Sequence, residues 1–434
     1  MGRVLIPRQK GAPYTQRRLA AAVAVTAVLL GAGTGVNRLA AGDRPTPVSS
    51  ASPTSRPEVT IAVADGGTTA PATDPATTAP ATSVPATSVP SAPVPSAPSA
   101  TTTMTLRERI TGDISPKSVA ASGHGLVSAQ NMMYTHTMTV YESDGTLAAT
   151  IPDSVVLADF GIPGHPGTSQ GAPVETAFTR DGRFAYVSNY SMYGEGFGPE
   201  GGDACTPESG TEESFLYRVD TERFEIDQVI PVGAVPKYVA ITPDGATVLV
   251  TNWCTYDMSV VDVASAQEVA RVPIGRYPRG IVVSPDSRTA YVSVMGGSEI
   301  MAVDLATRSA SVLASVGAGP RHLVISPDGS TVYVTSNDAG TVSAVDTATG
   351  AVLDSVSTGT QPRSMAISSD GTALYVVEYE SSEVVKLRTE DLATLVAVPT
   401  DYHPIGIAYE PTTGAVWVAC YGGSIMIFDD GAAA

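Results

Sequence analysis

The chain has 434 residues, 43% of them hydrophobic, and carries 43 Asp and Glu against 25 Lys and Arg, a formal net charge of −18 at pH 7. So acidic a protein repels phosphate backbones and anionic membrane surfaces at long range, which argues against bulk nucleic-acid binding. Its three cysteines form no Cys-x-x-Cys pair, so neither a zinc ribbon nor a c-type haem attachment is indicated. We therefore expect no cofactor.

Residues 1–42 have the pattern of a secretory signal peptide or an uncleaved signal anchor. They contain six basic residues and no acid, and the apolar run RRLAAAVAVTAVLLGAGTGV occupies residues 17–36. NRLAAG (37–42) is one possible cleavage site, and the Arg pair at 17–18 also resembles a twin-arginine signal, although an ordinary basic leader is the simpler interpretation. Either way, we expect the rest of the chain to be extracytoplasmic, with membrane contact only through this segment.

Residues 43–103 consist mainly of Pro, Ala, Thr and Ser. Such a composition offers too little apolar surface to offset the entropy of ordering the chain, which predicts a disordered stalk. As an extended polyproline II spacer it would reach up to about 190 Å, and its hydroxyl groups could carry sugars. Residues 104–434 then form the folded domain, whose 17 basic and 39 acidic residues give a net charge of −22.

The folded domain is a repeat. Five prolines stand 42 residues apart, at Pro236, Pro278, Pro320, Pro362 and Pro404. An Asp-Gly or Asp-Ser pair follows eight residues later in the first four copies, and then a β-branched run such as TVYVTS (331–336). Pro173 and Pro116 open two earlier copies with longer loops, which makes seven units.

Short alternating runs joined by Asp-Gly turns predict antiparallel strands, and four strands in about 42 residues predict one propeller blade. The fold class is therefore all-β, a seven-bladed β-propeller, and we expect a monomer. The last unit ends at DDGAAA without a fourth strand. We predict that residues 104–114 supply this strand and close blade seven, because closure removes the open sheet edge.

The segments YVSN (186–189), LVTN (249–252) and YVTS (333–336), together with openings of the PRxxxxSPDG kind, resemble the YVTN-type β-propeller repeat family. The resemblance covers nearly all of residues 104–430. It implies a seven-bladed, extracytoplasmic propeller, but not one activity, because a fold does not fix a function.

Basic residues directly follow the opening proline in five of the seven units: Lys117, Lys237, Arg279, Arg321 and Arg363. Sevenfold geometry would gather them at one mouth of the channel, where they would favour a small anion, an anionic glycan or a partner protein. The alternative is that they pair with acids of neighbouring blades, such as Glu175, and hold the ring together.

Aromatic residues form a second predicted ring 17 residues after the prolines: Tyr190, Trp253, Tyr379 and Tyr421. Aromatic faces beside cations suit sugars and flat polar ligands, although the same residues could simply pack between blades. Three further candidates flank the same opening, namely Tyr238, His322 and His403.

The longest insertion, residues 191–214, lies in blade two between the second and third strands and should reach the same mouth. It contains Cys205, which we expect to form a disulfide with Cys254 in an oxidising compartment. Pairing of Cys205 with Cys420 is the alternative. The acids of the insertion match no known calcium loop, so a solvated acidic loop is expected.

The sequence leaves three functions open. The favoured one is a non-catalytic binding module, because no catalytic motif accompanies the two rings. The rival is a lactonase-like, metal-dependent hydrolase of the propeller type, whose metal ligands would be Glu175, Asn189, Asn252 and Glu378. The third is a purely structural surface protein.

Overall fold

Strands occupy most of the chain that the structure describes. The computed structural model describes residues 99–198 and 203–431, which belong to the unit spanning residues 86–434. Its only helical segments in these residues are two short 3-10 turns, η1 (Leu157–Phe160) and η2 (Pro207–Ser209). No helix in this part of the chain is long and apolar enough to cross a membrane. The signal segment predicted for residues 1–42, and the stalk predicted for 43–103 except its last five residues, lie outside the described residues.

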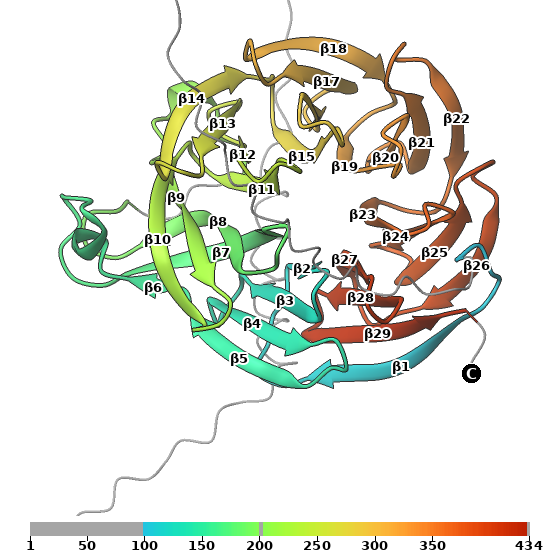
Figure 1. Ribbon diagram of the computed structural model, residues 1–434, viewed down its shortest axis with the longest axis horizontal. Helices are drawn as coiled ribbons and strands as arrows, with labels where there is room; N and C mark the ends of the chain where they lie inside the picture. Colours follow the sequence, from blue (N-terminus) through green and yellow to red (C-terminus); the bar gives the residue numbers. More distant parts are fainter. Residues whose placement is uncertain (1–98, 199–202, 432–434) are drawn as a thin grey trace, which may run out of the picture. The chain divides into compact units, whose positions relative to one another are not determined.

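The strands form seven antiparallel sheets arranged as blades around an axis (Figure 1). Blade one contains β2 (Ser118–Ala121), β3 (Leu126–Asn131), β4 (Thr137–Glu142) and β5 (Leu147–Pro152). Blade two contains β6 (Ser154–Val155), β7 (Ser169–Phe178), β8 (Phe184–Tyr193), β9 (Ser214–Asp220) and β10 (Glu225–Val232). Blade three contains β11 (Pro236–Ile241), β12 (Thr247–Asn252), β13 (Asp257–Asp262) and β14 (Gln267–Pro273).

Blades four to six keep the 42-residue spacing. Blade four contains β15 (Pro278–Val283), β16 (Thr289–Val294), β17 (Glu299–Asp304) and β18 (Ser309–Ser315). Blade five contains β19 (Pro320–Ile325), β20 (Thr331–Ser336), β21 (Thr341–Asp346) and β22 (Val352–Ser357). Blade six contains β23 (Pro362–Ile367), β24 (Ala373–Glu378), β25 (Glu383–Arg388) and β26 (Thr394–Pro399). Blade seven contains β27 (Pro404–Glu410), β28 (Ala415–Cys420), β29 (Ser424–Asp430) and β1 (Met104–Thr111).

The repeated Asp-Gly turns explain why the sequence repeats its SPDG segment. In blade five, Asp328 accepts hydrogen bonds from the Ser326 hydroxyl at 2.6 Å and the Ser330 amide at 3.0 Å. The hydrogen bond from Ser326 is the main reason that the pKa of Asp328 falls to about 2. Gly329 has φ of 75°, a conformation that glycine adopts without strain. The turn chemistry therefore sets where each hairpin reverses.

The inner strands of the seven blades touch in a closed ring, from β2 through β7, β11, β15, β19 and β23 to β27 and back to β2. Apolar residues fill the space between neighbouring blades. One buried cluster, for example, joins Leu249 and Val260 of blade three to Val292 and Val303 of blade four. Each blade thus buries its sheet faces against its neighbours, which is the reason the blades need one another.

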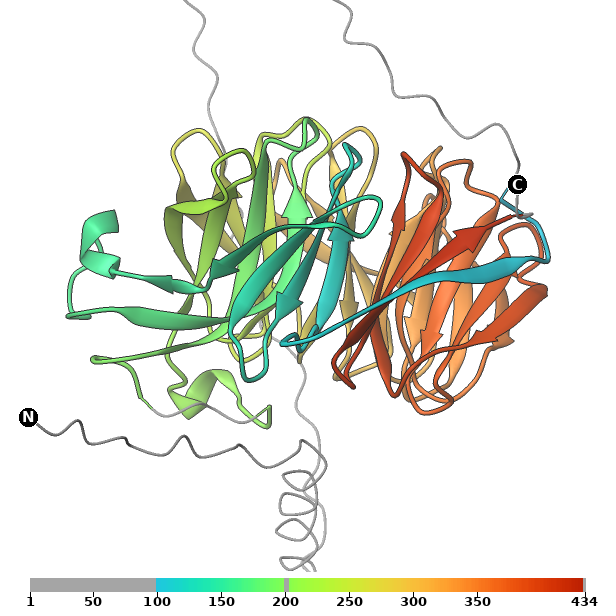
Figure 2. The same ribbon diagram turned by 90° about the horizontal axis from the view of Figure 1, so that it is seen from below.

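The predicted closure of blade seven is confirmed. Strand β1 pairs antiparallel with β29, with Met104 opposite Asp430 and Thr111 opposite Ser424. Figures 1 and 2 show β1 lying along the outer edge of the C-terminal blade. Behind this pairing, Lys386 of blade six forms a buried ion pair with Asp430. The first and last strands of the propeller are therefore locked together next to blade six.

The connection between blades one and two differs from the simple long loop that the sequence suggested. The short strand β6 pairs with the beginning of β7, with Ser154 opposite Gln170 and Val155 opposite Ser169. The 3-10 turn η1 follows, and Leu157 within it is fully buried. This segment has no copy elsewhere in the chain, so the repeat gave no signal for it.

We predict that Lys386→Met lowers the free energy of unfolding by about 3–5 kcal/mol, because it leaves the Asp430 carboxylate buried without its cation. Adding Asp430→Leu to the same chain should recover most of the loss, since the isolated charge is then gone. Urea unfolding measures both variants. If the double variant is as unstable as Lys386→Met, the buried charge is not what destabilises the single variant.

Candidate functional site

A β-bulge follows the opening proline in blades three to seven. In blade five, Pro320 faces Ser336 and His322 faces Thr335, so Arg321 has no opposite residue in the ladder. The register shifts at the same place in the other four blades, beside Lys237, Arg279, Arg363 and Ile405. A bulge adds one residue to a strand and redirects its side chain. The basic residues therefore leave the alternation of the strand and face the mouth of the channel.

Hydroxyl groups hold these bulged strands in place. Thr251 of blade three donates to the Arg279 carbonyl of blade four at 2.7 Å. Ser293 of blade four donates to the Arg321 carbonyl of blade five at 3.0 Å. The strands also approach closely, because a Cβ atom on Gly280 would lie 2.8 Å from the Arg321 carbonyl oxygen. Neighbouring basic residues are thus held on a rigid ring.

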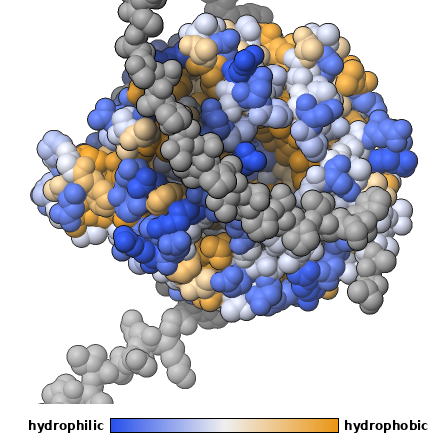
Figure 3. Space-filling view, viewed as in Figure 1, coloured by the Kyte–Doolittle hydropathy of each residue, from blue (hydrophilic) through white to orange (hydrophobic). Residues whose placement is uncertain are grey.

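A cavity of about 460 Å³ lies at this mouth and brings both predicted rings together. The residues that follow the seven opening prolines all line it: Lys117, Val174, Lys237, Arg279, Arg321, Arg363 and Ile405. Six of the residues that stand 17 positions after an opening proline also line it: Met133, Tyr190, Trp253, Met295, Tyr379 and Tyr421. Met132 and Asp203 complete the lining. Figure 3 shows the propeller in space-filling form, with an opening near its centre.

The cavity contains more cations than carboxylates. Glu175 lies 3.7 Å from the Lys117 ammonium and 3.4 Å from the Arg279 guanidinium, so one carboxylate serves two cations. Asp203 lies 2.9 Å from the Lys237 ammonium. Within residues 99–198 and 203–431, no carboxylate lies within 4.0 Å of Arg321 or Arg363. Five basic side chains therefore meet only two paired carboxylates.

Two of the cavity arginines are buried and a third is partly exposed. Arg279 is 5% exposed and Arg321 is 7% exposed, whereas Arg363 is intermediate. Arg321 donates from Nε to the Arg363 carbonyl at 3.0 Å, but its charge faces other cations. Burial first, and then the nearby Arg279 and Arg363, lower its pKa. Burial likewise lowers the pKa of Lys117 and, to about 8, that of Lys237.

Two buried nitrogen atoms at the cavity have no hydrogen-bond partner in the described residues, namely Lys117 Nζ and Arg363 Nε. Buried donors are normally satisfied, and an unsatisfied one carries a desolvation cost of about 1–3 kcal/mol or more when charged. A bound anion would accept hydrogen bonds from such donors. The two unsatisfied donors therefore favour an anionic ligand for a reason separate from the excess of positive charge.

The aromatic side chains are occupied by the protein's own cations. The Lys237 ammonium lies 4.2 Å from the centre of the Tyr190 ring and 5.1 Å from that of Trp253. The Arg363 guanidinium lies 3.8 Å from the centre of the Tyr379 ring. Cation–π contacts of this kind hold a cation over an aromatic face. The aromatic rings therefore position cations, which leaves their faces less suited to stacking against a sugar.

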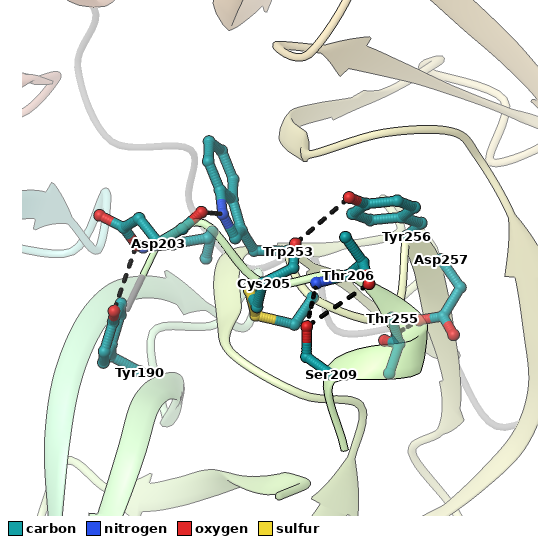
Figure 4. Close-up of a disulfide and its surroundings, with 11 residues drawn as sticks. Tyr190, Asp203, Cys205, Thr206, Ser209, Trp253, Thr255, Tyr256 and Asp257 are labelled. Carbon is teal, nitrogen blue, oxygen red and sulfur yellow. Dashed lines mark hydrogen bonds and ion pairs between the residues drawn. A yellow bond between two sulfur atoms is a disulfide. The ribbon is translucent and has the colours of Figure 1, made fainter. Parts of the chain in front are cut away.

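The insertion of blade two reaches the same cavity, as the sequence indicated. A disulfide joins Cys205 to Cys254, with Cα atoms 5.3 Å apart, which confirms the predicted pairing, and Cys420 is a buried free thiol. Around the disulfide, the Trp253 indole donates to the Asp203 carbonyl at 2.8 Å (Figure 4). The Tyr190 hydroxyl donates to the Asp203 carboxylate at 3.2 Å. These contacts hold the Asp203 carboxylate beside Lys237.

The three remaining candidates do not line the cavity. Tyr238 and His322 are hydrogen-bonded to each other, 3.0 Å between the hydroxyl and Nε2. Burial, followed by the charges of nearby Arg279 and Arg321, lowers the pKa of His322 to about 3. His403 stacks between Tyr379 and Tyr402, with centroid distances of 4.0 and 3.6 Å. These side chains lie close to the cavity residues but are engaged within the protein.

The residues considered as metal ligands also lie outside the cavity lining. Glu175 pairs with two cations, as described above. The Asn252 amide donates to Asp257 at 2.7 Å, and the Asn189 amide donates to the Phe215 carbonyl at 3.4 Å. Glu378 is fully buried, and burial raises its pKa to about 7. Within the described residues, no group of three His, Cys, Asp or Glu is placed to hold a metal ion, so we propose no metal site from these four residues.

Sequence reasoning missed six lining residues: Met132, Met133, Val174, Asp203, Met295 and Ile405. Four of them occupy the two periodic positions already singled out, so the spacing would have found them had apolar residues been counted as well. Met132 adjoins one of these positions. Asp203 comes from the insertion, which has no copy to compare.

Comparison with known proteins agrees with the fold. Residues 296–420 match the family described as the Cytochrome D1 heme domain, a match that covers less than half of the chain. Kuenenia stuttgartiensis hydrazine synthase is a similar solved structure, with a TM-score of 0.57 and 19% identity, covering 73% of this chain and 96% of that chain. No curated protein matches. Identity this low shows the fold alone, and the protein is a seven-bladed β-propeller.

The lowered pKa of Lys237 predicts a pH dependence of stability. The unfolded chain binds this proton more tightly, so folding carries a full penalty below pH 8 that disappears as the pH rises from about 8 to 10.5. Between pH 7.5 and 9.5, wild type should therefore gain about 1–2 kcal/mol of unfolding free energy relative to Lys237→Met. Urea unfolding of both chains at the two pH values measures this. A difference that does not change with pH would contradict the prediction.

Proposed function

We propose that the protein is an extracytoplasmic binding module of the YVTN type, and that the cavity at its channel mouth binds a small anionic ligand. The observation that carries the proposal is the excess of cations over carboxylates around the cavity, where Arg321 is buried and no carboxylate of the described residues lies within 4.0 Å of Arg321 or Arg363. Buried charges normally require opposite charges, so a site of this kind is completed by an anion.

Two further features support a small anion rather than a glycan or a large partner. The cavity volume of about 460 Å³ falls within the range of about 300–1,000 Å³ usual for small-molecule sites. The faces of Tyr190, Trp253 and Tyr379 are already covered by Lys237 and Arg363. Guanidinium groups bind carboxylate and phosphate groups through paired hydrogen bonds, which suits a ligand that carries such a group.

The extracytoplasmic location has its own support. Residues 1–42 carry a basic leader and an apolar run, and residues 43–103 have the composition of a spacer. The disulfide between Cys205 and Cys254 is of the kind that persists in oxidising compartments. We therefore propose that the module is exported and either released or held at the cell surface by its N-terminal segment.

The name of the matched family raises haem as a ligand, but none of the described residues that line the cavity is a histidine, its commonest axial ligand. Haem iron is held by an axial His, Cys, Met or Tyr, most often His. None of the described histidines lines the cavity, and both ring nitrogens of His322 lie within hydrogen-bond distance of other groups. The Met295 sulfur accepts a hydrogen bond from the Arg321 guanidinium. The donor set therefore singles out no axial ligand, and we assign no haem.

Arg321→Met separates a binding site from a structural ring. We expect it to weaken the binding of inorganic phosphate at least tenfold while leaving the unfolding free energy unchanged or raised by up to about 3 kcal/mol, because a buried unpaired charge is removed. Calorimetric titration with phosphate, at constant ionic strength set with sodium chloride, measures the binding. Urea unfolding measures the stability.

Arg218→Met is the matched control. Arg218 is held by Asp227 through two hydrogen bonds of 2.8 Å and does not line the cavity. This variant should bind phosphate as wild type does. If wild type binds no phosphate, or if Arg321→Met is destabilised with phosphate binding unchanged, the cations serve only to hold the ring together and the proposed function is wrong.

A further inference from the structure

The cavity wall is divided into two sectors, and the division follows the order of the blades. Blades three to six contribute Lys237, Arg279, Arg321 and Arg363 in uninterrupted succession. Blades seven, one and two, which are also consecutive around the closed ring, contribute Ile405, Met132, Met133 and Val174. Most of the cations therefore line one arc of the cavity and most of the aliphatic side chains line the opposite arc, with Lys117 and Met295 as the exceptions.

The side chains of the apolar arc are packed into the protein. Met132 packs against a buried cluster that includes Val174, Tyr190 and Trp253. Ile405 is only 5% exposed, and it occupies the same repeat position as the arginines of the other arc. Methionine side chains adapt to ligands of varied shape, which suits the flexible part of a small molecule.

The one cation in the apolar arc lies near a carboxylate. Lys117 belongs to blade one, and its ammonium lies 3.7 Å from Glu175 of blade two, which also pairs with Arg279. In the opposite arc, Arg321 and Arg363 meet no carboxylate of the described residues within 4.0 Å. The cations without a nearby carboxylate thus lie in blades five and six, across the cavity from Val174 and Met133.

We infer that the ligand of this cavity is a soluble amphiphilic anion, with an anionic head held by Arg321 and Arg363 and an apolar chain lying against Met132, Met133, Val174 and Ile405. The inference rests on the proposed function and adds the chemical class of the ligand. A fully hydrophilic anion would leave the partly exposed Met132 and Met133 in contact with water, whereas a chain of several methylene groups would bury them.

A series of alkyl phosphates tests this. The full-length chain is titrated calorimetrically with inorganic phosphate and with ethyl, butyl, hexyl and octyl phosphate, each below its micelle concentration. Each buried methylene should raise the affinity up to about fourfold, so hexyl phosphate should bind at least tenfold more tightly than ethyl phosphate. A negative heat-capacity change that grows with chain length should accompany the gain.

A variant in the cavity and a control outside it locate the chain. Met133→Gln, in the apolar arc, should reduce the affinity ratio of hexyl phosphate to inorganic phosphate at least threefold. Met301→Gln, in β17 and outside the cavity lining, should leave that ratio unchanged. Should Met133→Gln fail to fold, the chain-length series on wild type decides the question by itself.

The outcomes separate the two proposals. If inorganic phosphate does not bind, the proposed function fails, and the inference that rests on it fails too. If inorganic phosphate binds and chain length does not change the affinity, the cavity binds anions but the amphiphilic ligand is wrong. If Arg321→Met weakens the binding of inorganic phosphate but leaves the affinity of hexyl phosphate unchanged, the inference is also overturned, because the chain would then bind without its head group at Arg321.

Discussion

The pairing of β1 with β29 is the contact on which the remaining geometry depends. It joins the two ends of the propeller into one sheet, and the inner strands of blades seven and one then pack so closely that a Cβ atom on Gly406 would lie 2.7 Å from the Ser118 Cα atom. Closure turns a linear repeat into a ring, so that any fixed offset from the opening prolines recurs around a single axis. A ring open at this point would separate Ile405 from Lys117 and divide the cavity wall.

Within the closed ring, the position after each opening proline, bulged in blades three to seven, decides what faces the channel mouth. Blades two and seven carry Val174 and Ile405 at this position, so the scaffold accepts an apolar residue there. A buried cation at the same position lowers the free energy of unfolding more than an apolar residue does. It loses its hydration, and the carboxylate near it is shared with another cation. The proposed binding of an anion would account for the basic residues in five of the seven blades, because the ligand would supply the missing negative charge.

The sequence predicted those features that recur. The 42-residue period located the blades, the closing strand and the predicted basic and aromatic rings. Each copy of the repeat places its strands, turns and bulges at equivalent positions. The Cys205–Cys254 pairing followed from placing both cysteines at equivalent loops of adjacent blades. The β6–η1 segment and Asp203 were beyond this reasoning, since each lies in a segment without a second copy. The contacts of Lys237 with Tyr190 and Trp253 were also beyond it, because spacing places side chains near one another without fixing which ring a cation covers.

The candidate site is asymmetric although the fold is nearly symmetric, and the departures from the repeat cause the asymmetry. Blade two departs twice: it carries the uncharged Val174 at the bulge position, and its insertion brings the Asp203 carboxylate to Lys237. Glu175 of the same blade pairs with Lys117 of blade one and Arg279 of blade four. Negative charge is therefore concentrated at blade two, and the positive field at the mouth is strongest at the far side, where Arg321 and Arg363 stand. An anion that enters this cavity consequently has one preferred orientation, which a symmetric ring of seven identical side chains could not provide.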